Sequence, residues 1–486
     1  MALGQEDFGL YGLIGSIVIF LSFFNIQFAG ALSRFYAYAV GEANVSEDSK
    51  EALEECRKWF STGVTIHTLV PVLLVCAGYP IGVWAIQSGV IGVPVVRMNA
   101  CVWLWRFVSV SAFVSMVNVP FSAMYTAKQY IAELTVYSFG QTLLRTMFIY
   151  YMTLSPGDWL VKYGFATCLF AVVPQLVICF RAIVIFPECR LRWSYVARWF
   201  YMKRIGSYAL WQTFGGLGYL ARHQGLTVIV NRYFGPRLTA SFSIGGTVSA
   251  EAASLTGALQ GAFAPAITTT CGEGDMRRVR EMAYRTCKFG TLLTMMFAVP
   301  MALEIAELLH VWLKDVPPHA EGICLSMLGV IVVEKLTLGH IIGVNATGRV
   351  AKFQFYRGAI SMMAIPLSIL MVLIWRHIYF VCLSLFVITC VSCCSDVWLA
   401  RARIGLSVRY WMSKILLPLS VVLIFMCAFG YLPHFMMSPS VFRMCVTTGF
   451  SLSIFLILSW LFVLDVDERA VIVSRIKTMP ILKFGG

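Results

Sequence analysis

Apolar runs of about 20 residues recur along the whole of this chain, and each is long enough for a helix to cross the hydrocarbon core of a bilayer. This recurrence constrains the fold more than any other feature of the 486 residues. Hydrophobic residues make up 59% of the chain and charged residues 13%, a balance that excludes a soluble globular domain. The strands of a membrane barrel would be shorter and would alternate. We therefore predict an all-α polytopic membrane protein.

The runs predict about thirteen transmembrane helices. They lie near residues 9–33, 64–86, 101–124, 131–153, 163–186, 205–232, 238–265, 289–312, 322–345, 356–375, 378–400, 413–433 and 440–464. The largest connector, residues 34–63, is charged and predicts an amphipathic helix on the membrane surface. No connector is long enough for a folded soluble domain.

The stretch from Phe234 to Lys288 repeats, in one constant register and without a gap, the text that opens the chain. The matched pairs include Gly15 with Gly246, Gly30 with Gly261 and Cys56 with Cys287. A chance likeness between two spans rich in small residues is the alternative, but a register held this far favours an internal repeat. An even number of predicted spans separates the copies, so the repeats are parallel, about an axis along the membrane normal.

The repeat divides the chain into parts. We predict an N-terminal lobe at 1–186, a C-terminal lobe at 205–400, two additional transmembrane helices at 410–465 and a tail at 466–486. A predicted span, residues 205–232, precedes the second copy, whereas the first copy has no such span before it. We therefore expect a first helix that this sequence lacks, through truncation, a start placed at an internal Met, or a real loss.

The basic residues predict the orientation. Most Lys and Arg residues lie in alternate connectors, beginning with the connector after the first span. The other connectors hold only Arg97, Lys162, Arg232, Arg237, Lys314 and Arg376. This asymmetry places the N-terminus outside and the C-terminal tail in the cytoplasm. The net charge of +14 then describes a membrane face that attracts anionic lipids rather than a nucleic-acid surface.

Several motifs follow one another in a recognisable order. They are ARHQGLTVIVNRYFGP at 221–236, Pro265, the Gly-Glu-Gly-Asp connector at 272–275, Cys287-Lys288, PMALEIAELLHVWLKDVPP at 300–318 and NATGRVAKFQFYRG at 345–358. With them the chain resembles the lipid-linked oligosaccharide (O-antigen type) flippases of the multidrug/oligosaccharidyl-lipid/polysaccharide exporter (MOP, MATE-like) superfamily. That resemblance implies a fold of about fourteen spans, from which this chain departs by lacking the first.

The resemblance also implies a function. The chain would carry an undecaprenyl-diphosphate-linked glycan from the cytoplasmic to the outer leaflet of the bacterial inner membrane, for cell-surface polysaccharide synthesis. It would be a transporter and not an enzyme, without catalytic residues, metal or cofactor, and with H⁺ or Na⁺ as a coupling ion. The sequence contains no Walker loop, so ATP is not expected to drive it directly.

A diphosphate within the membrane requires cations, and three basic residues lie deep in predicted spans: Arg222, Arg145 and Lys335. His223 and Gln224 adjoin Arg222 and form with it the most polar cluster in any span. We predict that these five residues line the substrate cavity, and that Glu251 and Asp396 are candidates for ion coupling. For the three basic residues the alternative is a side chain that extends to the interface or, for Lys335, an internal pair with Glu334. For Glu251 and Asp396 the alternative is a structural pair with an arginine of another helix, and for His223 it is a hydrogen-bonded structural role. Arg106, Arg181 and Arg443 lie nearer to span ends and are expected to extend to the interface.

Two other functions stay open at this point. One is an ion-coupled multidrug or toxin extruder of the same superfamily, which would favour a cavity dominated by carboxylates. The other is a membrane oligosaccharide polymerase or ligase. Such enzymes use large external loops, and the short external connectors predicted here argue against one.

Overall fold

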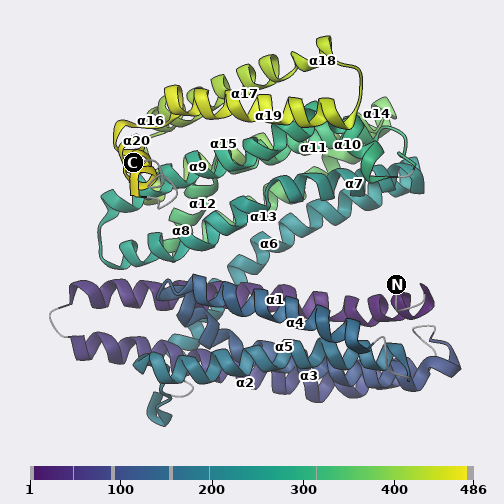
Figure 1. The fold of residues 1–486 in the computed structure, drawn as a ribbon. Helices are drawn as coiled ribbons and strands as arrows, with labels where there is room; N and C mark the ends of the chain where they lie inside the picture. The colour runs from purple at the N-terminus through teal and green to yellow at the C-terminus, as the bar shows by residue number, and fades with distance from the viewer. Residues whose placement is uncertain are drawn as a thin grey trace, which may run out of the picture. The chain divides into compact units, whose positions relative to one another are not determined.

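The computed structural model describes residues 5–46, 49–88, 93–152, 157–195, 198–313 and 315–478. All regular structure within those ranges is helical (Figure 1), which confirms the predicted fold class. The chain divides into two compact units. Unit 1 comprises Met1–Thr213 with Pro265–Asp275, and unit 2 comprises Phe214–Ala264 with Met276–Gly486. Two helices, α6 (Trp199–Phe234) and α8 (Ser254–Gly272), pass from one unit to the other.

Unit 1 is built from long, unbroken helices. They are α1 (Gln5–Val45), α2 (Ser49–Gln87), α3 (Met98–Ala127), α4 (Ile131–Met152) and α5 (Trp159–Ile185). Helix α3 contacts α1, α2 and α5, so it forms the centre of the unit, while α4 packs mainly on α5. The outer face of α4 is apolar and exposed, with Phe139 and Tyr150 among its most exposed side chains.

The prediction of a surface helix at residues 34–63 is wrong. The charged segment instead belongs to the facing ends of α1 and α2, which continue as regular helices to Val45 and from Ser49. Aromatic side chains explain the difference, because Phe35 stacks on Trp59 with ring centroids 4.3 Å apart and both are buried. An amphipathic surface helix would leave such rings at the interface, whereas two packed helices bury them.

Unit 2 differs because four of its long helices are interrupted. The broken pairs are α7 (Pro236–Ala252) with α8, α9 (Met276–Leu303) with α10 (Ile305–Trp312), α11 (Ala320–Lys335) with α12 (Leu338–Ala346), and α13 (Ala351–Met362) with α14 (Ala364–Trp375). The helix α15 (Tyr379–Ile404) follows them without a break. Pro300 lies one turn before the interruption at Glu304, and it has no N–H with which to donate a hydrogen bond inside α9.

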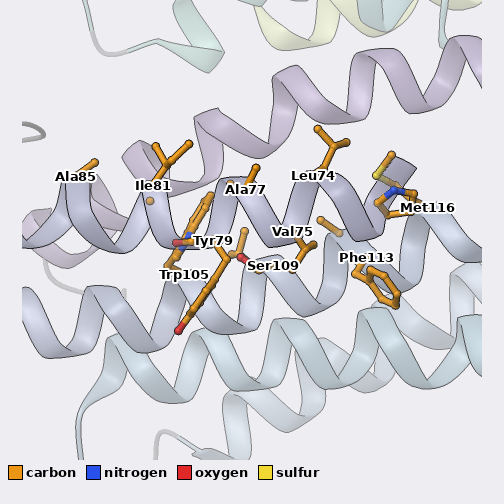
Figure 2. Close-up of a pocket in the computed structure, with 15 residues that line it drawn as sticks. Leu74, Val75, Ala77, Tyr79, Ile81, Ala85, Trp105, Ser109, Phe113 and Met116 are labelled. Carbon is orange, nitrogen blue, oxygen red and sulfur yellow. The ribbon is translucent and has the colours of Figure 1, made fainter. Parts of the chain in front are cut away.

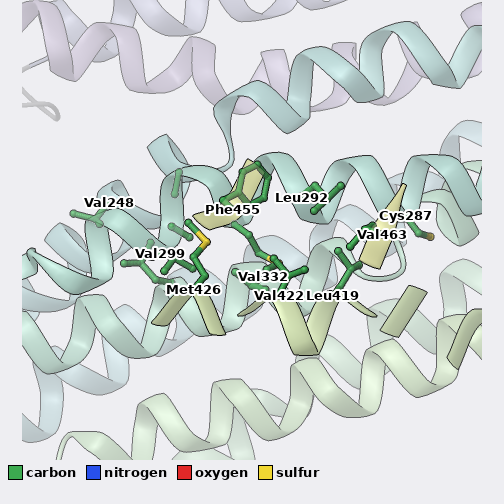
Figure 3. Close-up of a cluster of buried hydrophobic side chains, with 14 of the residues drawn as sticks. Val248, Cys287, Leu292, Val299, Val332, Leu419, Val422, Met426, Phe455 and Val463 are labelled. Carbon is green, nitrogen blue, oxygen red and sulfur yellow. The ribbon is translucent and has the colours of Figure 1, made fainter. Parts of the chain in front are cut away.

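The C-terminal helices pack onto the core of unit 2. They are α16 (Val408–Trp411), α17 (Leu417–Gly430), α18 (Pro433–Met436), α19 (Val441–Leu458) and α20 (Val466–Thr478). Helices α17 and α19 contact each other and α9. Figure 3 shows the result, a cluster in which Leu419, Val422 and Phe455 lie with Leu292 and Val299 of α9.

Every predicted span coincides with a helix or a broken helix. Within the described ranges, eight helices are long and apolar enough to cross a membrane, or nine if α11 and α12 count as one bent span. The chain is thus a multi-pass membrane protein, and the count of about thirteen spans stays a prediction. Lys314 and the end of the predicted tail, residues 479–486, lie outside the described residues.

Candidate functional site: a buried ion-pair cluster in unit 2

Arg222 is the centre of a buried polar cluster. It lies on α6, about 18 Å from the Phe234 end at 1.5 Å per residue, and its side chain is 3% exposed. One terminal nitrogen forms an ion pair with Glu334 of α11. The other donates to the hydroxyl of Thr389 on α15 at 3.3 Å. The guanidinium also lies over the ring of Tyr219, 4.8 Å from its centroid.

These contacts explain how a guanidinium is tolerated in an apolar unit. Removing a charge from water costs several kcal/mol, about as much as a well-placed opposite charge and further hydrogen bonds return. Arg222 has both, although its Nε has no hydrogen-bond partner within the described ranges. Glu334 is less enclosed, with 19% of its side chain exposed. The pair is therefore closed on the arginine side and partly open on the glutamate side.

A second carboxylate lies at the interruption between α11 and α12. Asp396 of α15 is 3% exposed, and one of its oxygens accepts a hydrogen bond of 3.3 Å from Thr337 in that interruption. The other oxygen lies 3.9 Å from Nε of Arg357, too far for a hydrogen bond. Asp396 is consequently a buried carboxylate whose nearest basic side chain, Arg357, does not hydrogen-bond to it.

Lys335 adjoins Glu334 at the end of α11 but does not pair with it. Successive residues on a helix point in different directions, and Glu334 turns instead toward Arg222. Lys335 is half-buried, and within the described ranges no ion pair joins it to a carboxylate.

The polar triplet on α6 does not act as one surface. His223 is half-buried, and its ring lies 4.6 Å from that of Tyr219. Gln224 is exposed. The structure thus brings Arg222 and His223 against the same tyrosine and directs Gln224 away from both.

Two further predicted residues are not members of the cluster. Arg145 belongs to α4 of unit 1 and is half-buried, with no ion pair to it among the residues that the structure describes. Glu251 is exposed near the end of α7. The structure gives neither residue a partner that would define its function, and both roles stay predictions.

A second buried ion pair escaped the sequence analysis. Arg443 of α19 was expected to extend to the interface, and this expectation is wrong. Its guanidinium binds both oxygens of Glu304, at 3.2 and 2.9 Å, and Thr447 donates to the same carboxylate at 2.7 Å. Glu304 is 2% exposed. A charged residue within an apolar span is visible in the sequence. That Arg443 and Glu304 are partners is shown only by the packing of α19 on α9.

Unit 1 contains an apolar groove of about 440 Å³ between α2 and α3 (Figure 2). Gly82 lies against the ring of Trp105, where a β-carbon would come within 2.3 Å of it, so the glycine permits this close contact. Leu74 and Phe113 line another part of the groove. Such a lining suits hydrocarbon and offers nothing to a diphosphate.

Solved structures share this architecture. A MATE transporter in the bent conformation matches with a TM-score of 0.66 and 15% identity, over 83% of this chain and 88% of that one. An outward-facing multidrug resistance MATE family transporter of the MOP superfamily matches with a TM-score of 0.63 and 14% identity, over 83% and 89%. A MOP superfamily transporter from Pyrococcus furiosus, described as having a binding pocket of reverse polarity, matches with a TM-score of 0.64 and 13% identity over the same shares.

These structural similarities establish the fold. Because the sequence identities are low, they establish nothing beyond the fold. The chain is a helical multi-pass membrane protein, and its architecture is that of the MATE transporters of the MOP superfamily. No protein-family profile and no curated protein matches it.

Proposed function

We propose that this protein is a flippase that moves an undecaprenyl-diphosphate-linked oligosaccharide from the cytoplasmic to the outer leaflet of the bacterial inner membrane. The MATE-type fold supports the broader class of membrane transporter. The finer proposal rests on Arg222. A guanidinium with a deep position and paired hydrogen-bond donors is suited to two phosphate oxygens.

The pairing suggests how the guanidinium is kept ready. In the resting state Glu334 occupies the terminal nitrogen that a phosphate oxygen would take. An arriving diphosphate then exchanges with a carboxylate instead of binding a bare buried cation, which lowers the cost of keeping Arg222 in an apolar environment. Lys335 and Arg145 are the further cations of this proposal, with His223 and Gln224 as polar contacts.

Asp396 and Glu251 are the proposed coupling residues. Asp396 is the stronger of the two because it is buried beside a helix interruption. Protonation of Asp396 or Na⁺ binding to it would neutralise a buried negative charge and so change the net charge of the cluster. The protein's C-terminus would be cytoplasmic and its basic connectors would contact anionic lipids.

The proposal is tested with Arg222→Gln combined with Glu334→Gln. Loss of Arg222 alone would leave Glu334 uncompensated and could lower the amount of folded protein, whereas the double variant removes both charges. We expect membrane abundance near that of the wild type and accumulation of lipid-linked glycan on the cytoplasmic side. Arg222→Lys should keep part of the transport if charge suffices, and little if two-point phosphate contact is needed.

Arg181→Gln is the matched control, because this arginine pairs with Glu133 at an exposed position in unit 1. It should transport normally. Normal glycan export by the double variant would contradict the flippase proposal.

The competing function is an ion-coupled multidrug extruder. The fold shared with a multidrug resistance MATE transporter and the buried carboxylate Asp396 favour it. Loss of drug resistance, with intact glycan export, in Asp396→Asn would support the extruder and reject the flippase.

A further inference from the structure

Two histidine rings from different loops of unit 2 lie against each other. His319 precedes α11 and His377 precedes α15. Their ring centroids are 5.6 Å apart and the ring planes make an angle of 84°. Both side chains are exposed. Neither residue belongs to the cluster around Arg222, so the pair is a separate feature.

The backbone beneath the two rings is firmly anchored. Each histidine is followed directly by a buried residue, Ala320 at 1% exposure and Ile378 at 2%. His319 has a φ of 59°, a left-handed conformation that costs a non-glycine residue free energy. Such conformations persist where the surrounding structure imposes them, and they cluster at functional sites.

Tyr379, the first residue of α15, joins the two loops. Its ring lies on α11 at Gly322, where a β-carbon would come within 2.3 Å of the hydroxyl. The tyrosine hydroxyl is 3.4 Å from Nδ1 of His319, and the tyrosine backbone N–H donates to Nδ1 of His377 at 3.4 Å. Both rings are therefore engaged through Nδ1, and no hydrogen bond to Nε2 of either ring is seen within the described ranges.

We propose that His319 and His377 together bind a divalent transition-metal ion of the Zn²⁺ type. An ion about 2.0–2.1 Å from one nitrogen of each ring lies about 3.2 Å from each centroid, and a tetrahedral angle then separates the centroids by about 5.2 Å. The observed centroid separation of 5.6 Å is close to this value, so the spacing of the two rings is compatible with one shared ion.

The hydrogen bond at Nδ1 of His319 favours the metal-binding tautomer, whereas the one at Nδ1 of His377 does not. His319 can donate from Nδ1 to the tyrosine hydroxyl, which fixes the ring with Nε2 unprotonated and orients it as outer contacts do in metal sites. His377 accepts at Nδ1, so its proton must move there from Nε2 before the ion binds. The bond given up is long, 3.4 Å, and therefore weak.

The site has two protein ligands, and water would complete the coordination. Within the described ranges no three His, Cys, Asp or Glu side chains gather as a metal site, so binding should be weaker than at a structural zinc site. The ion would tie the first turn of α11 to the first turn of α15. These are the helices that carry Glu334, Thr389 and Asp396, so the ion would restrain the frame of the buried cluster.

The test is Zn²⁺ binding by the full chain in detergent, purified without a histidine tag and with exposed thiols alkylated. Titration calorimetry compares the wild type with His319→Asn, His377→Gln and the double variant. Asparagine tolerates the left-handed conformation of residue 319. Each single variant should weaken binding at least about tenfold, since even outer contacts of metal ligands contribute 10–100-fold. The double variant should bind at least as weakly as either single variant, because it retains neither ring.

His310→Gln is the matched control. His310 is exposed in the last turn of α10 and no histidine ring lies against it in the described part of the chain, so its loss should leave the affinity unchanged. Zn²⁺ should also raise the melting temperature of the wild type and of His310→Gln but not of the other variants. Equal binding by all variants, or a loss confined to one of the two histidines, would overturn the proposal.

Discussion

The two units treat one corresponding helix face in opposite ways. In unit 2, Gly358 of α13 is covered by α6, and a β-carbon on Gly218 of α6 would come within 2.5 Å of the Gly358 backbone. In unit 1, the helix at the same place in the chain order is α4, and a β-carbon on its Gly140 would meet nothing within 4 Å. Gly358 lies at a close helix crossing, whereas the space beside Gly140 is open within the described ranges.

The same contrast extends to charge. Unit 2 encloses ion pairs between helices far apart in sequence, with Arg222 on Glu334 and Arg443 on Glu304. In unit 1, buried carboxylates are paired at helix ends, as Glu188 is with Lys128. A helix that closes over its neighbours therefore allows a cation to lie deep and paired. No such cover is seen over Gly140 of α4 within the described ranges.

The largest loss of stability should come from breaking the pair Glu304–Arg443 in unit 2. Glu304→Ala leaves a buried guanidinium without its carboxylate, and loss of one partner of a buried pair costs about 3–5 kcal/mol. We expect a large fall in the amount of folded protein and in its melting temperature in detergent. Glu304→Leu combined with Arg443→Leu should recover much of the loss, because no charge is then left uncompensated. A small effect of Glu304→Ala would show that this pair is solvated.

An intermediate effect on stability should come from adding a methyl group at Gly218 of α6, compared with Gly140 of α4. Gly218→Ala forces a methyl group into the backbone of Gly358, and overpacking of this kind costs about 1–3 kcal/mol or more. Gly140→Ala has open space and should be neutral or slightly stabilising, because alanine is the better helix former. Thermal unfolding of both variants measures the contrast. Equal destabilisation would mean that the face of α4 is also covered in the membrane.

The smallest effect should come from an exposed pair of unit 1. Arg181 pairs with Glu133, but 49% of the arginine side chain is exposed, and such pairs contribute little to stability. Arg181→Gln should unfold at the temperature of the wild type. A clear decrease would show that unit 1 also depends on charge pairing and would weaken the comparison.

The sequence was sufficient for the fold class and for the approximate position of each apolar span, because apolar length and hydropathy determine both. It failed at residues 34–63, where charge suggested a surface helix although the rings of Phe35 and Trp59 pack together. Hydropathy averages over such aromatic contacts and does not report which helix faces which.

The candidate site was predictable only in part. A deep arginine is visible in sequence, so Arg222 could be singled out, but its partner Glu334 is 112 positions away and lies on another helix. Arg443 could not be told from a residue that extends to the interface, because only packing brings Glu304 to it. Pairing between distant helices is a property of the fold, and a single sequence carries no record of it.

The interrupted helices of unit 2 need partners that are synthesised late, and this delays the completion of folding. The carbonyl of Leu303, at the end of α9, accepts from His434 at 3.1 Å, and the carbonyl of Leu336, beyond the end of α11, accepts from Trp411 at 3.0 Å. Both donors are made late, 131 and 75 residues after the groups that they satisfy. A nascent chain that ends before Trp411 therefore holds two exposed carbonyls in an apolar environment, each costing several kcal/mol. Unit 2 can reach its final state only when its last helices have entered the membrane.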